Sequence, residues 1–491
     1  MPRLILVLLI SPLLFAQNPS ALQLPLSGRA GQSGSVNSVQ TSVPGVTTSV
    51  NTINTTVQVQ GPYGGSVLQP GALDGKLTFR NAVKRGLEFN LGTAGLSAAI
   101  RQAEGQRRVV RSALMPNVSA ALRENVQQTN LKALGVKIPF APTIVGPFNY
   151  FDLRATIAQT LWDFTSRNNL KSAEELVKAN EAALRDARDL VVLAVGGAYL
   201  QVIAANARVQ SAQSQIDTAQ ALFKQTQDQK NAGLAAQIDV NRTQVQLQTQ
   251  RQRLASLKAD LTKQKINLAR LIGAPPNGSL EIADEIPFSA PPDLNVDQAL
   301  KQAFQNRSDL QSAEAQVRAA EKARAAARAE RLPSLGVSAD YGVIGTNPSQ
   351  SHGTFTFVGS VRIPIWAGGR TEGEIQQSEA ALDQRRSELA DLKGKIESEV
   401  RNSFLDMETA AAQLEVARNN QQLARETLEL TKQRLEAGIS PPLEVVQAEE
   451  SVAASDLDYI TALFAHNLAK ISLARALGKA EESYAAFLKL P

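Results

Sequence analysis

The chain contains two copies of one long pattern, and this internal repeat constrains its fold more than any other feature. Residues 201–273 match residues 406–478 without a gap when 205 is added to each position. In each copy, large apolar residues recur every seven positions on both sides of a glycine, Gly233 or Gly438. In the first copy these residues are Val202, Val209, Ile216, Phe223, Val240, Leu247, Leu254, Leu261 and Leu268. A sustained seven-residue period predicts two very long helices that pack as a coiled coil and turn at the glycine.

The second copy keeps this pattern with small changes. Its repeating residues are Met407, Leu414, Leu428, Leu435, Val445, Val452, Tyr459, His466 and Leu473. Gln421 is a polar break among the positions that precede the turn. A helix over residues 163–231 would be on the order of 100 Å long at about 1.5 Å per residue, enough to cross much of a periplasm.

Ahead of each hairpin the apolar period changes from that of a helix to that of a strand. Apolar and polar side chains alternate over about ten residues, which predicts strands with one apolar and one polar face. The strands are expected at about residues 117–128, 151–162, 335–344 and 354–366. Aromatic residues lie near the strand ends, as they do in the two girdles of a membrane barrel.

A soluble antiparallel sheet with one wet face would show the same alternation. Two observations favour a membrane barrel: the long helices have a seam of their own to fill, and the strand length matches a tilted crossing of the outer membrane. Open edges are not tolerated in lipid, so four strands cannot close a barrel and several chains must contribute to one. The predicted lumen residues are Asp152, Arg154, Asp340 and Arg362.

The start of the chain carries Arg3, an apolar run over residues 4–15, and Ala16. This layout predicts a signal peptide over residues 1–16, and a membrane anchor is the alternative. Residues 17–72 are rich in Ser, Thr, Gln, Asn, Gly and Val. They offer little large apolar area to offset the entropy of ordering, so we expect a flexible leader. No other stretch approaches 18 consecutive apolar residues, so no transmembrane helix is expected.

The repeat also sets the remaining boundaries. Helical patterns precede both strand pairs, and here the two copies match at an offset of 217, with Leu77 answered by Leu294 and Pro116 by Pro333. The predicted units are a first repeat at 73–273, a proline-rich linker at 274–293, a second repeat at 294–478 and a C-terminal tail at 479–491.

Composition excludes several classes of function. A net charge of +5 over 491 residues, with no basic cluster, does not indicate nucleic-acid binding. The absence of cysteine removes disulfides, thiolate metal sites and cysteine nucleophiles. The two histidines are His352, in a predicted external loop, and His466, at a seam position. We therefore predict no catalytic residues, no metal and no cofactor, and an enzyme is the least supported class.

The ordered pattern resembles the outer membrane efflux protein family, the TolC-like outer membrane factors. The resemblance covers about residues 73–480 and rests on the duplicated order of helix, strand pair and helical hairpin. It also rests on the junctions Leu161-Trp162-Asp163-Phe164 and Ile365-Trp366-Ala367-Gly368-Gly369-Arg370, and on the two glycine tips. It implies a homotrimer with a twelve-stranded barrel in the outer membrane and a twelve-helix periplasmic tunnel. The far end would stay closed until a periplasmic adaptor and an inner-membrane pump engage it.

The hairpin tips, at about residues 231–239 and 436–444, are the candidate functional sites. Each glycine is followed six residues later by an acid, Asp239 or Glu444. Three Glu444 side chains around a narrow axis would repel anions, attract cations and raise one another's pKa. We therefore predict that Glu444 forms a selectivity ring and that Asp239 holds the neighbouring hairpin. The predicted adaptor-docking residues are Gly233, Leu234, Ala235, Gly438, Ile439 and Ser440, of which Ser440 is also an expected helix cap.

The leading hypothesis is a passive exit duct of a tripartite efflux pump or a type I secretion system. One alternative is a periplasmic adaptor, which also carries a long helical hairpin. The other is a structural coiled-coil spacer that conducts nothing. An adaptor has one hairpin between β modules, whereas this chain has two, each preceded by a strand pair. A spacer would need no polar barrel face, whereas the predicted strands carry one.

Overall fold

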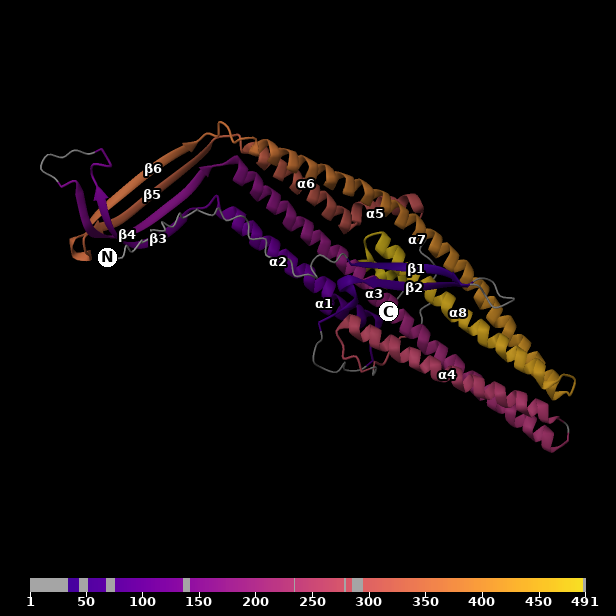
Figure 1. The fold of residues 1–491 in the computed structure, drawn as a ribbon. Helices are drawn as coiled ribbons and strands as arrows, with labels where there is room; N and C mark the ends of the chain where they lie inside the picture. Colours follow the sequence, from indigo (N-terminus) through magenta and orange to yellow (C-terminus); the bar gives the residue numbers. More distant parts are fainter. Residues whose placement is uncertain are drawn as a thin grey trace, which may run out of the picture.

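A sheet forms one end of the molecule, and two long helical hairpins run from it to the opposite end (Figure 1). The computed structural model describes residues 34–43, 52–67, 76–135, 142–233, 235–277, 280–284 and 295–488. The expected signal peptide at 1–16 lies outside the described residues.

The sheet has the strand order β3-β4-β5-β6, and all neighbouring pairs are antiparallel. Its strands are β3 (Asn117–Asn130), β4 (Ile144–Trp162), β5 (Ser334–Gly345) and β6 (His352–Arg362). Directly opposed residues share a face, so the register gathers the apolar side chains of all four strands on one side. This side carries Val118, Leu122, Leu153, Ile157, Ala339, Tyr341, Phe355 and Phe357. Its large side chains are exposed, as a lipid-facing surface requires.

A register shift in β4 moves one aromatic residue to the apolar side. Thr160 pairs with Gly336, whereas Trp162 pairs with Leu335, so the simple alternation stops between them. A bulge of this kind re-aims the side chain that follows it. Trp162 therefore joins the apolar side at the end of the sheet next to the helices, where an aromatic girdle is expected.

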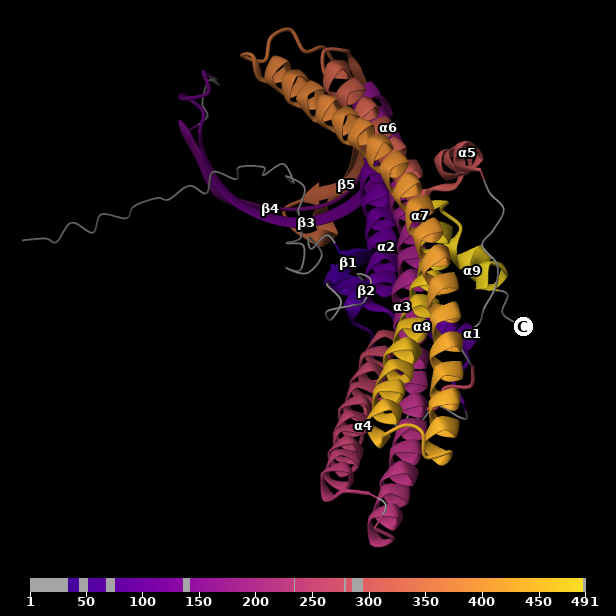
Figure 2. The same ribbon diagram turned by 90° about the vertical axis from the view of Figure 1, so that its right-hand side faces the viewer.

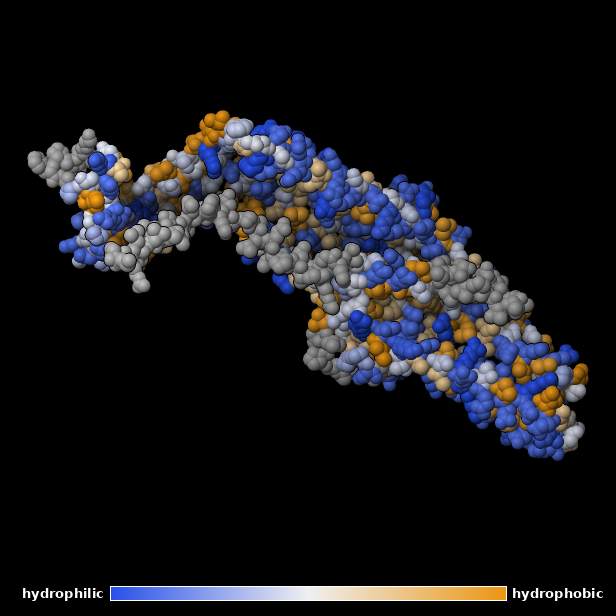
Figure 3. Space-filling model, in the orientation of Figure 1, coloured by the Kyte–Doolittle hydropathy of each residue, from blue (hydrophilic) through white to orange (hydrophobic). Residues whose placement is uncertain are grey.

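Two predicted strand limits were wrong. β6 ends at Arg362 rather than 366, because Pro364 has no N–H to continue the ladder. Trp366 lies beyond the strand with 88% of its surface exposed, and an apolar patch marks this junction between β6 and the next helix (Figure 3). β4 begins at Ile144, well before the expected 151. Pairing with β3 resumes beyond Gly146 and Pro147, because a register shift skips these two residues and so requires no ladder hydrogen bond from the proline.

Each strand pair leads into a long helical hairpin. The first consists of α3 (Phe164–Asn231) and α4 (Gln237–Ile272), and the second of α7 (Arg370–Glu436) and α8 (Pro442–Ala476). Shorter helices precede the strands: α1 (Phe79–Phe89) and α2 (Leu91–Ser112) in the first repeat, α5 (Val296–Asn306) and α6 (Ser308–Ala329) in the second. The predicted long helices are thus present, and both hairpins end on the side away from the sheet (Figures 1 and 2).

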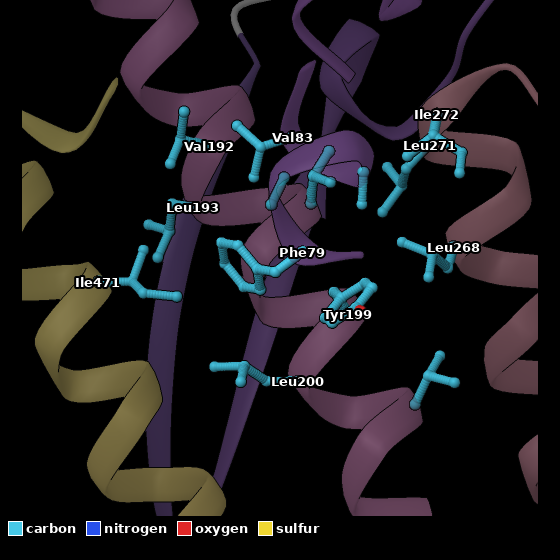
Figure 4. Close-up of a cluster of buried hydrophobic side chains, with 14 of the residues drawn as sticks. Phe79, Val83, Val192, Leu193, Tyr199, Leu200, Leu268, Leu271, Ile272 and Ile471 are labelled. Atoms are coloured by element: carbon cyan, nitrogen blue, oxygen red, sulfur yellow. The ribbon is translucent and has the colours of Figure 1, made fainter. Parts of the chain in front are cut away.

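The main core lies around the middle of α3, where α1, α4 and α8 converge. Phe79 packs edge-on against Tyr199 with ring centroids 5.2 Å apart, and Leu268 and Ile471 approach from the flanking helices (Figure 4). The Tyr199 hydroxyl donates to the Leu77 carbonyl at 2.8 Å, which ties α3 to the segment before α1.

This part of α3 has the length and composition of a membrane-spanning helix, but 72% of its most apolar window is buried inside the protein. It is therefore a core helix.

The expected flexible leader was wrong for part of its length. Residues of β1 (Ser35–Val43) and β2 (Thr52–Gln60) form an antiparallel hairpin, which a 3-10 helix, η1 (Gly61–Gly64), follows. Val36 and Tyr63 are buried and belong to the main core. The hairpin packs against α3 and α8, which supply the apolar area that this segment lacks by itself.

The C-terminal tail is also ordered over α9 (Ala480–Leu488). The Arg188 Nε donates to Glu481 Oε2 at 2.7 Å, and the backbone N–H of Glu481 donates to Asp189 at 2.8 Å. Ala480 and Leu488 are buried. α9 is therefore fastened to α3 by both charge and apolar contact.

Candidate functional site

Both tips turn at a glycine in the left-handed region, with φ of 77° at Gly233 and 71° at Gly438. At the second tip the N–H of Ile439 donates to the Arg434 carbonyl (2.9 Å), and that of Gly438 donates to the Leu435 carbonyl (3.0 Å). This bond pair closes a helix that ends on glycine. Ile439 is exposed, whereas Leu234, its counterpart in the first tip, lies outside the described residues.

Glu444 lies in the first turn of α8 and is bound to its own tip. The Ser440 hydroxyl donates to Glu444 Oε2 at 2.6 Å, and Arg434 Nη1 lies 3.9 Å from the same oxygen. The expected cap was wrong: the residue before the helix is Pro441, and Ser440 is buried one position earlier. In a capping box, the carboxylate at the third helical position accepts the backbone N–H of the cap residue. Pro441 has no N–H, so the Glu444 carboxylate accepts the Ser440 hydroxyl instead.

Asp239 occupies the matching position in α4. Its Oδ1 lies 3.6 Å from Arg242 Nη1, and the side chain is in the first helical turn. A carboxylate there is stabilised by the helix dipole. Helix stability alone thus accounts for an acid at this position in both tips, and the gating roles of Asp239 and Glu444 stay predictions.

A groove joins the two tips. It is lined by Ile238, Asp239, Asn241, Arg242, Thr243, Val245, Gln246, Pro442, Leu443 and Val446. The structure therefore brings Asp239 beside the first turn of α8, although Glu444 is not among the lining residues. Beneath this surface, Leu222, Leu435 and Val445 form a buried apolar cluster that joins α3, α7 and α8.

The sheet brings three of the predicted lumen residues together. Arg154 pairs with Asp340, lies 3.3 Å from Asp152 Oδ1, and donates to the Thr354 hydroxyl at 3.1 Å. Arg362 is opposite Ser334, at the helical end of the sheet, and takes no part in this cluster. A lumen position for these residues stays a prediction because it depends on closure of the barrel.

A polar layer centred on the buried Asp456 lies between the hairpins and was not predicted from the sequence. Asp456 of α8 accepts hydrogen bonds from Ser211 (2.8 Å), Gln421 (2.8 Å) and Arg425 (2.9 Å), which joins α8 to α3 and α7. The Gln421 break in the heptad pattern was the available signal, since a polar residue in a seam needs a partner. Glu449, also missed, is buried one heptad nearer the tip.

Across the described ranges, no group of three or more His, Asp or Glu side chains is placed to hold a metal ion. His466 is buried in the α8 seam, as its heptad position predicts. The chemistry available at the tips is therefore charge, hydrogen bonding and apolar contact.

A family model described as "Outer membrane efflux protein" matches residues 94–274 and 299–479, one match in each repeat. The pyoverdine export outer membrane protein OpmQ of Pseudomonas aeruginosa is 25% identical over 396 residues, which cover 78% of this chain and 81% of that protein. The outer membrane protein OprJ of the same species is 26% identical over 419 residues, covering 81% and 83%.

Solved structures agree with this match at the level of fold. The crystal structure of the outer membrane protein VceC from Vibrio cholerae superposes with a TM-score of 0.72 at 18% identity. The superposition covers 82% of this chain and 97% of VceC.

Proposed function

Because this chain belongs to the outer membrane efflux protein family, we propose that three copies assemble into one duct with a twelve-stranded barrel and a helical tunnel. The chain is an outer membrane efflux channel with a long periplasmic extension, and the adaptor alternative finds no support. In this proposal the duct conducts passively from periplasm to exterior. A periplasmic adaptor and an inner-membrane pump supply the energy and engage the tips.

The trimer is supported by a difference between the two repeats: one face of α6 is buried against α3, whereas the matching face of α2 is exposed. In the second repeat, α6 lies along α3: Ser312 Oγ donates to the Ala179 carbonyl and Ser172 Oγ to the Ala319 carbonyl, both at 2.9 Å. The α6 residues on this side are buried: Ser312, Ala315, Ala319, Ala326 and Ala329. Their counterparts on α2, 217 positions earlier, are all exposed: Gly95, Ala98, Gln102, Val109 and Ser112.

The counterpart of α3 in the second repeat is α7. The exposed face of α2, which corresponds to the buried face of α6, should therefore pack against α7 of a second copy. The α2 helix of that second copy packs in the same way against α7 of a third. Such a head-to-tail contact closes into a ring when the rotation between copies closes.

The sheet supports the same arrangement. β3 and β6 are the edges of the four-stranded order, and a lipid environment requires edges to be paired. Pairing β6 of one copy with β3 of the next leaves no edge once the ring closes.

Within this ring, the second tip of each copy approaches the axis. We assign to Glu444 the selectivity ring, because it lies at the second tip in the first turn of α8. We assign to Asp239 the contact that holds the neighbouring hairpin, because it lines the groove between α4 and α8. The exposed residues around the tip glycines, such as Ile439, form the adaptor-docking surface.

Cysteine cross-linking tests the ring directly, because the natural chain has no cysteine. Gln102 and Gln377 are the counterparts of Ala319 and Ser172, whose atoms touch in the chain. The double variant Gln102→Cys, Gln377→Cys should form a disulfide between copies and run as a trimer in a non-reducing gel.

The control pair combines Gln102→Cys with Ser387→Cys. Ser387 lies ten residues further along α7, about 15 Å away at the helical rise, which is too far for a disulfide. Monomers from both pairs in folded protein, or a ladder that continues beyond three, would overturn the closed ring.

A further inference from the structure

Glu449 is a buried acid in the seam between the two hairpins. It lies on α8, with Val445 one turn nearer the tip and Asp456 one heptad further from it. Val445 packs with Leu222 of α3 and Leu435 of α7, and Asp456 is bonded to Ser211 of α3. These contacts bracket Glu449 from both sides, so it lies where α8 meets α3 and α7. Only 7% of its surface is exposed.

The two acids of this seam differ in their hydrogen bonds. Asp456 is satisfied by three donors on two helices. Glu449 Oε1 is buried and has no hydrogen-bond partner among the described residues. A buried carboxylate is costly unless it is paired, whereas its protonated form needs far less compensation. The packing of the hairpins around Glu449 therefore favours its neutral form.

The charges around Glu449 give little compensation. On α7, Lys432 acts on Glu449 from a distance, and Arg425 is engaged by Asp456. The buried sides of α3 and α4 at this level are uncharged: Ala212, Ile216, Ala219, Leu222, Thr243, Gln246, Leu247 and Gln250. Two of these, Gln246 and Gln250, also have a buried side-chain atom without a partner among the described residues. The seam near the tip is thus less fully satisfied than the layer at Asp456.

We propose that Glu449 couples protonation to closure of the tunnel, so that its neutral form keeps α8 packed against α3 and α7 and its ionised form favours separation of the tip. This proposal rests on the tip being the gate. It adds a regulator that is distinct from the ring assigned to Glu444. Ionised Glu449 gains water when the helices separate, and the polar layer at Asp456 remains as the point from which they part.

The titration of the group fits this role. Burial raises the pKa of Glu449 from 4.5 to about 7, against a lowering effect of Lys432. Because the pKa is raised in the closed form, closure is favoured at low pH and weakened as the pH rises towards and through 7. The first hairpin has no such response, because the counterpart of Glu449 is Gln244, which is exposed.

Hydrogen exchange of residues 440–456 in the purified full-length protein tests the proposal. Glu449→Gln keeps the shape but cannot ionise. At each pH the wild type is compared with this variant, which cancels the intrinsic effect of pH on exchange. The ratio of protection, variant over wild type, should rise about tenfold between pH 6 and pH 8. Glu450→Gln is the matched control, because Glu450 is adjacent and exposed, and it should follow the wild type.

A ratio that stays constant between pH 6 and pH 8, or that Glu450→Gln reproduces, would overturn the role of Glu449. Single-channel recording separates this result from the fate of the duct. Wild-type channels should open more often at pH 8 than at pH 6, and Glu449→Gln channels should not. Channels that conduct without this difference would leave the duct standing and remove the switch. A shift in exchange without any conductance would keep the protonation-dependent packing of α8 but contradict the duct, and with it the coupling to tunnel closure.

Discussion

Asp189 shows how a buried acid in this fold serves stability. Its carboxylate accepts the N–H of Glu481 at the start of α9, and it lies close to Arg475 and Asp186. Burial raises its pKa from 3.8 to about 6, although the hydrogen bond and Arg475 act in the opposite direction. The native state therefore binds this proton more tightly than the unfolded chain does. Ionised Asp189 therefore lowers the free energy of unfolding above pH 6, and this destabilisation disappears as the pH falls towards 4.

The variant Asp189→Asn should be more stable than the wild type at pH 7.5. The amide oxygen can still accept the Glu481 N–H, but the charge is removed. A pKa rise of this size corresponds to about 3 kcal/mol at most, so the unfolding temperature should increase by several degrees. Thermal unfolding followed by circular dichroism measures this, and the advantage should shrink as the pH approaches 4.

Asp217→Asn, an exposed change on the same helix, serves as the control and should have little effect at either pH. Equal stability of Asp189→Asn and wild type at pH 7.5, or a difference that does not depend on pH, would contradict this account.

The helices carry a charge pattern that matches the proposed contacts between copies. α4 has seven Lys and Arg residues against two Asp and Glu, whereas α7 has ten against fourteen. In the chain, α8 packs against α3, so the proposed ring pairs α4 of one copy with α7 of the next. α7 also carries exposed apolar side chains that this contact could cover: Leu405, Val416, Leu423 and Leu430. The contact thus combines an apolar stripe with opposite charge.

Reversing charge on α4 should weaken assembly. In the variant Arg251→Glu, Arg253→Glu, two attractive groups become repulsive towards α7. The fraction of trimers in detergent at low salt should therefore fall several-fold, and added salt should reduce the effect. Analytical ultracentrifugation measures the trimer fraction. The same reversal on α3, Lys224→Glu and Lys230→Glu, is the control with equal charge change and should have a smaller effect. Equal loss in both variants would contradict the assigned contact.

The long elements were predictable from the sequence because their signals repeat many times. A heptad pattern sustained over nine positions predicts α3 and α4. The alternation of apolar and polar residues predicts which side of each strand is apolar. The β1–β2 hairpin and α9 were not predictable, because each depends on a surface that only the folded core provides. Trp162 changed faces through a single bulge, which a period of two cannot anticipate.

The tips show the same limit at the candidate site. The sequence located Gly233, Gly438 and both following acids. It could not reveal that Ser440 binds Glu444, since that bond follows from the position of Pro441. Nor could a heptad count distinguish the satisfied Asp456 from the unsatisfied Glu449, because the difference lies in which neighbours donate.

In the proposed assembly, the single chain is one third of a closed ring. In the described part of the chain, β3 and β6 are the edges of the sheet, and α2 has an exposed face whose counterpart on α6 is buried. The two hairpins end near each other, on the side away from the sheet (Figures 1 and 2). In the proposed ring, one rotation between copies would satisfy each of these features. We propose that this ring encloses a conducting path.

The conducting path can be tested by single-channel conductance of the purified protein in a planar bilayer. We predict a small, cation-selective conductance, because the proposed ring places three Glu444 carboxylates around the closed end. Glu444→Gln should raise the conductance or reduce the cation preference, while Glu450→Gln, an exposed change on the same helix, should do neither. Conductance that is unaffected by Glu444→Gln would place the gate elsewhere in the duct. Verified, membrane-inserted oligomers that conduct nothing would contradict the duct itself and favour a structural spacer.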